Sequence, residues 1–148
     1  MAYTNALSAY RETRIKTASQ GQLIIMLYDG AIKQLDHGME LLTLNAVGKK
    51  DPARIEGIGK AVVKTQEIIT ELMVSLDFEQ GGDIAKNLFA LYTWFNQELL
   101  EANIAQDFKR IDNVRSMIKD LRNTWVEVIA KNSSEGASRP QAGINIAG

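Results

Sequence analysis

Few side chains in this sequence are of the types that catalyse reactions or bind metal ions. The 148 residues include one histidine, His37, and no cysteine. Di-iron sites in helical bundles use several glutamates and Glu-x-x-His pairs that point inward, and no glutamate stands three residues before His37. The absence of cysteine excludes disulfides and thiolate metal sites. We therefore expect no metal site and no cofactor.

The motifs of nucleophilic and phosphate chemistry are also absent. His37 has no serine or aspartate partner at a recognisable spacing, and the chain contains no G-x-S-x-G elbow. The glycine pair Gly81-Gly82 is explained by a turn between two helices, and the phosphate-binding P-loop pattern does not occur. We predict that the protein is not an enzyme and that it acts by binding another molecule.

The composition narrows the class of partner. With 45% hydrophobic and 24% charged residues, the chain is suited to one domain with a single core. The formal net charge of -1 gives no electrostatic reason to expect nucleic acid as a partner. No run of about 18 apolar residues is present, and the first residues lack the apolar centre of a signal peptide. We expect a cytoplasmic protein that does not insert into membranes.

The spacing of apolar residues at three and four positions predicts an all-α fold. Because the predicted helices are long and their connections short, they favour an antiparallel up-down four-helix bundle over residues 19–131. The charged side chains of the last helix are expected to face solvent and to form weak pairs along that helix. The four helices are predicted from Ser19 to about Asn45, from Asp51 to about Asp77, from about Asp83 to Ala105 and from Asp107 to about Lys131.

Capping residues mark the starts of three of these helices. Ser19 and Gln22 have the spacing of a capping box, in which each side chain bonds the backbone of the other residue. Asp51 precedes Pro52, which suits the first position of a helix because its missing N–H costs nothing there. Asp107 is the predicted cap of the last helix. These signals agree with the apolar periodicity.

Two terminal segments lack a continuous apolar face. We predict that residues 1–18 form a mobile lead, and that residues 132–148, rich in small and polar side chains, form a disordered tail. The lead nevertheless contains isolated apolar side chains, which could cover a groove of the bundle until a partner displaces them. These side chains are Tyr3, Leu7, Tyr10 and Ile15.

The first and third helices carry more apolar surface than one core seam needs. In the first helix, one stripe suits the core, and a second stripe must meet another helix of the chain, a sister subunit or a foreign partner. The core stripe consists of Leu23, Leu27, Ala31 and Leu41, and the second of Ile25, Tyr28, Ile32 and Met39. In the third helix, the residues beside the core stripe are Phe89 and Leu100 on one flank and Trp94 on the other.

Several linked motifs resemble one known family. The segments TASQGQLIIMLYDGAI (17–32), ELMVSLD (71–77), GGDIAKNLFALY (81–92), LLEAN (99–103) and LRNTW (121–125) are similar in order and spacing to the flagellin-specific secretion chaperones of the FliS family. The resemblance covers roughly residues 5–130. This chain departs from the family pattern at Gln20, where proline is usual, and the change does not disturb the predicted bundle.

The resemblance implies a cytoplasmic export chaperone. Such a protein binds the disordered C-terminal segment of flagellin, prevents premature polymerisation and helps deliver the subunit to the flagellar type III export gate. By position, Tyr10 matches the N-terminal tyrosine of the family, and Ile24, Leu27, Tyr28 and Asp29 lie in its LI-x-x-LYDG signature. Together with the stripes above, the predicted partner-binding residues are Tyr10, Ile24, Ile25, Tyr28, Ile32, Met39, Phe89, Trp94 and Leu100.

A different reading of the same apolar stripes remains open. A helical scaffold or adaptor protein could bury them in a homodimer, and the free chain would then need no client. The two readings differ in what covers the stripes, which the arrangement of the helices must decide.

Overall fold

The computed structural model describes residues 20–138, with side chains described as far as Lys131. This part of the chain forms four α-helices and no strand. They are α2 (Gln20–Val47), α3 (Pro52–Val74), α4 (Phe78–Ala105) and α5 (Phe108–Ser138). The all-α prediction is confirmed. The lead of residues 1–18, with Tyr10 and the lid hypothesis, and the cap at Ser19 lie outside the described residues.

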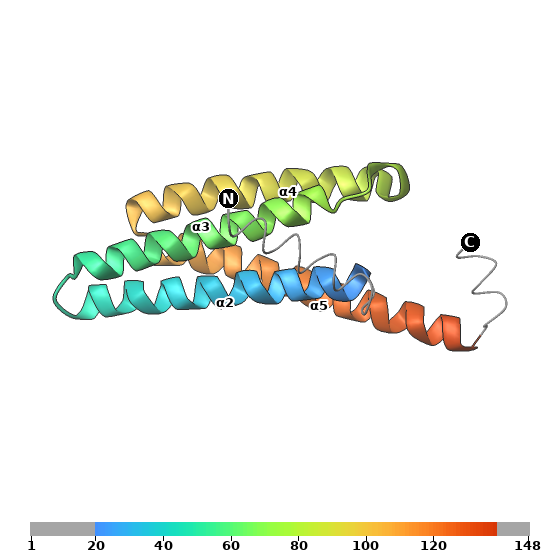
Figure 1. Ribbon diagram of the computed structural model, residues 1–148, viewed down its shortest axis with the longest axis horizontal. Coiled ribbons are helices and arrows are strands. Elements are labelled where there is room, and N and C mark those ends of the chain that lie inside the picture. The colour runs from blue at the N-terminus through green and yellow to red at the C-terminus, as the bar shows by residue number, and fades with distance from the viewer. Residues whose placement is uncertain (1–19, 139–148) are drawn as a thin grey trace.

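The helices run antiparallel to their chain neighbours and close into a ring (Figure 1). α2 packs on α3 and α5, and α4 packs on the same two helices from the other side. The start of α2 and the α3–α4 turn lie at one end of the bundle, from which the last turns of α5 project (Figure 1). Each helix therefore has two neighbours, and its remaining faces are turned to the core or outward.

The core extends along the bundle axis between all four helices. Because side chains three and four residues apart share a helical face, each helix contributes one stripe of large apolar residues to it. The fully buried members include Leu23, Tyr28, Leu35, Ile58, Ile69, Leu72, Tyr92, Phe95, Leu99, Ile111 and Ile118.

Aspartate caps begin α3, α4 and α5. The Asp51 side chain accepts the backbone N–H of Ala53 at 2.9 Å, and Pro52 occupies the first turn, as predicted. The Asp107 side chain accepts the N–H of Arg110 at 3.2 Å, which confirms the cap of the last helix. Each cap satisfies a backbone donor that has no partner within its helix.

The boundary between α3 and α4 differs from the prediction. The predicted break at Gly81-Gly82 is confirmed by the non-helical backbone of Gly82, but a short helical turn that the sequence did not predict begins α4 at Phe78, before the glycines. Asp77 accepts the N–H groups of Glu79 and Gln80, both at 3.0 Å, and so supports a helical turn before the glycines. Gly82 then has φ 51° and ψ −124°, which interrupts the helical geometry and forms a sharp bend between the first turn of α4 and the long helix that follows.

The end of α5 also differs from the prediction. The helix continues to Ser138, beyond the predicted end near Lys131, so the predicted disordered tail overlaps its last turns. Extending an existing helix costs far less than nucleating one, and no proline interrupts the chain before Pro140. α2 likewise ends at Val47 instead of near Asn45, and α3 ends at Val74 instead of near Asp77.

Ion pairs join α5 to its neighbours rather than to itself. Arg122 pairs with Asp29 at 2.8 Å, and Arg115, seven residues earlier, pairs with Asp36, seven residues later. The two pairs align α5 with α2, whereas the prediction placed these charges in pairs along one helix. On the other flank, Arg110 donates two hydrogen bonds to Glu98 on α4, at 2.8 and 2.9 Å.

Candidate protein-binding surface

The second apolar stripe of α2 is mostly covered within the chain. Asp29 and Asp36 lie on the same flank of α2 as this stripe, and both pair with α5. Tyr28 is fully buried, Ile25 is half-buried, and Ile32 and Met39 are partly buried against the core. The sequence left open whether another helix of the chain, a sister subunit or a foreign partner covers this stripe. A neighbouring helix of the same chain covers most of it.

Tyr28 forms a polar contact across the core. Its hydroxyl group lies 2.5 Å from that of Tyr92, so a hydrogen bond joins the diagonal helices α2 and α4. Burial raises the pKa of Tyr28 above its usual value of 10.0, although hydrogen bonds with Tyr92 and Trp125 act in the opposite direction. Burial is the main cause that raises the pKa of Tyr92 strongly. The electrostatic effect of the adjacent Tyr28 raises this pKa further. Both hydroxyl groups therefore stay protonated at neutral pH.

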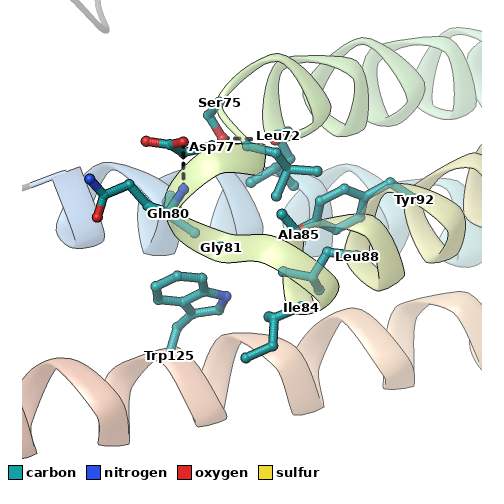
Figure 2. Close-up of a pocket in the computed structure, with 12 residues that line it drawn as sticks. Leu72, Ser75, Asp77, Gln80, Gly81, Ile84, Ala85, Leu88, Tyr92 and Trp125 are labelled. Carbon is teal, nitrogen blue, oxygen red and sulfur yellow. Dashed lines mark hydrogen bonds between the residues drawn. The ribbon is translucent and has the colours of Figure 1, made fainter.

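A pocket opens at the end of the bundle that holds the α3–α4 turn (Figure 2). It has a volume of about 280 Å³. The Trp125 ring extends from α5 toward the bent start of α4, beside Ile84 (Figure 2). Ile84 is 71% exposed and lies at the rim of this pocket. The lining residues are Ile24, Leu72, Ser75, Leu76, Asp77, Gln80, Gly81, Ile84, Ala85, Leu88, Tyr92 and Trp125.

The register between α3 and α4 places their exposed side chains at matching heights. The Gln66 amide donates to the backbone carbonyl of Asn96 at 2.9 Å, and the Cα of Gly59 faces the side chain of Asn103. Because the helices are antiparallel, these two contacts put Val63 near the height of Leu100 and Val74 near that of Phe89.

Exposed apolar residues of α3 and α4 form the surface that we call the α3/α4 face. Each is between 42% and 75% exposed, and the rings of Phe78 and Phe89 meet edge to face with centroids 5.9 Å apart. Such a series of large apolar side chains on one side of a small bundle indicates a binding surface. Its members are Val63, Val74, Phe78, Phe89, Leu100 and Ile104.

The structure brings together only two of the predicted partner-binding residues on this face, Phe89 and Leu100. Trp94 is 43% exposed but lies on the opposite flank of α4, where its ring packs on Phe95. Ile24 lines the pocket at the end of the bundle.

Sequence reasoning missed the other four members of the α3/α4 face, Val63, Val74, Phe78 and Ile104. Val63 and Val74 fall outside the core stripe of α3, and this offset was the available signal in the sequence. Only the pairing of α3 with α4 joins them to Phe89 and Leu100 in one surface.

The charged groups of the described residues form ion pairs between helices and no cluster suited to a metal ion. Within residues 20–138, no group of three or more His, Cys, Asp or Glu side chains is placed to hold a metal ion. The hydrogen bonds from Arg110 lower the pKa of Glu98, and Glu98 in turn raises the pKa of Arg110. His37 is exposed on α2. No helix in the described part is long and apolar enough to cross a membrane.

Comparisons with known proteins point to one family. The model of the family described as "Flagellar protein FliS" matches residues 3–132. The chain is 34% identical over 123 residues to the flagellar secretion chaperone FliS of Salmonella typhimurium (strain LT2), covering 82% of this chain and 85% of that protein. It is 31% identical over 127 residues to the protein of the same name from Vibrio cholerae, covering 83% and 88%. The Bacillus subtilis (strain 168) protein of that name is 29% identical over 129 residues, covering 87% and 90%.

Proposed function

Because this chain belongs to the FliS family, we propose that it is a cytoplasmic export chaperone for flagellin. A chaperone role in flagellar export follows from the family, and this role requires a client protein. The family is one of chaperones and not of enzymes, in agreement with the expectation from the sequence. The client that we propose is the C-terminal segment of flagellin, disordered while free.

The α3/α4 face is the observation that carries this proposal. An amphipathic client helix laid along it would remove the six exposed apolar side chains from water, at about 25 cal/mol for each Å² of apolar surface. A helix packed in this way presents its apolar residues at spacings of three and four. The chaperone would thereby hide the client surface that otherwise joins the growing filament.

The pocket beside Trp125 offers a second contact for the same client. The pocket is lined mainly by apolar side chains. A leucine or phenylalanine side chain of the client would fit its volume of about 280 Å³. A client that contacts both the pocket and the α3/α4 face would wrap around the bundle as separate short helices. The ordering of such a client costs conformational entropy, so the complex stays reversible and the client can be released for export.

Release at the export gate completes the proposed role. We infer that the chaperone delivers its client to the flagellar type III export apparatus, with the client's polymerising surface covered until that point. Neither nucleic acid nor membrane insertion takes part in this mechanism.

Binding can be tested with a flagellin C-terminal segment of about 40 residues, enough for two or three short helices. Phe89→Asp and Leu100→Asp place a charge in the proposed interface, and we expect each to weaken binding about tenfold or more in isothermal titration calorimetry. Val126→Asp is the matched control, because Val126 is also exposed and apolar but lies on α5. Unchanged far-UV circular dichroism would show that the variants are folded.

Two results would contradict the proposal. One is equal affinity for the client in all three variants and the unaltered chain. The other is a stable dimer of the free chain in sedimentation that Phe89→Asp converts to monomer, because the α3/α4 face would then serve self-association, as in the homodimeric scaffold alternative.

A further inference from the structure

A second pocket lies at the opposite end of the bundle, where the α2–α3 connection and the α4–α5 turn come together (Figure 1). It has a volume of about 380 Å³. Apolar side chains form much of its wall, and of the described residues that line it only Lys50 is charged. The lining residues are Leu42, Asn45, Ala46, Lys50, Ile55, Ala105 and Gln106.

The side-chain amide of Asn45 is only partly used within the chain. Asn45 is 7% exposed, and its Oδ1 atom accepts hydrogen bonds from the Asp51 backbone N–H at 3.2 Å and from Nη1 of Arg54 at 3.3 Å. Because both of these neighbours are donors, the atom between them must be the amide oxygen, which fixes the orientation of the group. The other atom of the amide, Nδ2, donates no hydrogen bond within the described residues.

The pocket gives access to this amide nitrogen. Of the described side chains, only Glu67 and Asn96 have a polar atom that is both shielded from water and without a partner, so Nδ2 of Asn45 is not sealed off. Asn45 is buried as a whole and lines the pocket, which is therefore the route by which a ligand reaches Nδ2. A buried group that keeps a donor free at the wall of a pocket is suited to a ligand that supplies the acceptor.

Two cationic groups lie near this donor. Lys50 lines the pocket, and the guanidinium group of Arg54 contacts the amide of Asn45. The carboxylates of the nearby caps, Asp51 and Asp107, already accept backbone N–H groups. α2 and α4 both end close to the pocket, and the two cations offset the partial negative charge of their last carbonyl groups. The donors and cations together favour an anionic acceptor, such as a carboxylate.

The pocket is continuous with the α3/α4 face. Ile104 belongs to that face, and the next residue, Ala105, lines the pocket. Along α4, Phe89 lies about 24 Å from Ala105, at 1.5 Å per residue. A client helix of this length that runs parallel to α4 would cover the face and bring its last residue to the pocket. The negative end of its dipole would then lie beside Lys50.

We propose that this pocket binds the C-terminal carboxylate of the client. The Asn45 amide and the Lys50 ammonium group donate to the carboxylate oxygens, and the apolar wall accepts the side chain of the client's last residue. This inference rests on the proposed function, since a C-terminal segment of flagellin ends in a free carboxylate. The pocket thereby fixes the direction in which the client lies on the α3/α4 face.

The first test compares two forms of one probe. The flagellin C-terminal segment is prepared with its free carboxylate and with a C-terminal amide, which removes the charge and leaves the sequence unchanged. We expect the free acid to bind the unaltered chain about tenfold or more tightly than the amide in isothermal titration calorimetry. The amidated segment should still bind, because its apolar side chains can reach the α3/α4 face.

A matched pair of lysines tests where the carboxylate binds. Lys50→Gln removes the cation of the pocket, and we expect it to reduce the preference for the free acid to about threefold or less. Lys49→Gln removes the same charge from the preceding residue, which does not line the pocket, and should keep the full preference. Both lysines are exposed, so the thermal midpoints of the two variants should match that of the unaltered chain.

Nuclear magnetic resonance can observe Asn45 without a substitution that breaks its bonds to Asp51 and Arg54. In the ¹⁵N-labelled chain, the side-chain amide resonance of Asn45 should move when the free acid binds and move much less with the amidated segment. Equal shifts with the two forms would speak against a carboxylate in the pocket.

The binding results separate this inference from the proposed function. Equal affinity for the two forms, or a preference that Lys50→Gln leaves intact, would overturn the inference. If the two forms bind equally while Phe89→Asp weakens the binding of both, the proposed function stands without the inference. If the unaltered chain binds neither form, both are wrong.

Discussion

The hydroxyl groups of Tyr28 and Tyr92 are the polar centre of a core that is otherwise almost entirely apolar. Their hydrogen bond of 2.5 Å joins two helices that are not neighbours in the ring, so it helps to define how α2 and α4 face each other. A buried hydroxyl without a partner costs free energy, whereas a paired one contributes modestly. Each tyrosine hydroxyl therefore needs the other.

Replacement of one tyrosine by phenylalanine should expose this dependence. We expect Tyr28→Phe to lower the free energy of unfolding by about 1–3 kcal/mol, because the Tyr92 hydroxyl is left buried without its partner. Urea denaturation followed by circular dichroism measures the change. Tyr28→Phe combined with Tyr92→Phe should cost less than the two single changes added together, and strict additivity would refute the coupling.

Among the elements, α4 shapes both proposed contact surfaces. Its first turn, capped by Asp77, folds over one end of the bundle, and the bend at Gly82 lets the rest of the helix follow α3 and α5. Gln80 and Gly81 before the bend and Ile84 after it line the pocket. Further along, the flank of α4 toward α3 carries half of the α3/α4 face, namely Phe89, Leu100 and Ile104.

The bend depends on the backbone conformation of Gly82. The Cβ atom of an alanine at this position would meet no atom within 4 Å. The φ of 51° at Gly82, however, is one that residues other than glycine rarely adopt. We expect Gly82→Ala to lower the free energy of unfolding by about 1–3 kcal/mol. The matched control is Gly59→Ala within α3, where ordinary contact and helical geometry predict unchanged or slightly higher stability in the same urea titration. Equal stability of the two variants would contradict the role given to Gly82.

At the scale of the whole molecule, the bundle is a closed ring whose outer sides differ in character. α5 covers the flank of α2 that carries the second apolar stripe, and ion pairs of Arg115 and Arg122 border this contact. No helix of the described part covers the outer side of α3 and α4. Six of the exposed large apolar side chains lie on this side, where a client can reach them.

Stability of the whole bundle should fall at high pH. The pKa values of Tyr28 and Tyr92 are raised in the folded protein, so the unfolded chain loses these protons first, near its usual value of 10.0. The contribution of the two protonated tyrosines to the free energy of unfolding is therefore complete below pH 10 and is lost as the pH rises above 10. Urea midpoints measured at several pH values from 8 to 11.5 test this expectation. Because other groups also titrate in this range, the control is the Tyr28→Phe, Tyr92→Phe double variant, whose midpoint should decline less. An equal decline in both proteins would speak against the effect.

The amino-acid sequence determined the class of fold and the class of function. Apolar periodicity and the caps at Asp51 and Asp107 depend on residues a few positions apart, so they can be read without knowing the tertiary structure. The family followed from linked motifs for the same reason, and the scarcity of reactive side chains correctly indicated a binding protein. The break at the glycine pair was predicted correctly, but the helical turn before it, which Asp77 caps, was missed.

Only the tertiary structure decided which apolar residues remain exposed. Ile32 and Phe89 look alike as residues beside a core stripe, yet one is covered by a neighbouring helix and the other is 42% exposed. A helical stripe reports how much apolar surface a helix carries, and the partner of that surface depends on the pairing and register of helices far apart in the chain. Gln66 and Asn96 show the same limit, because their hydrogen bond forms only when α3 and α4 lie side by side.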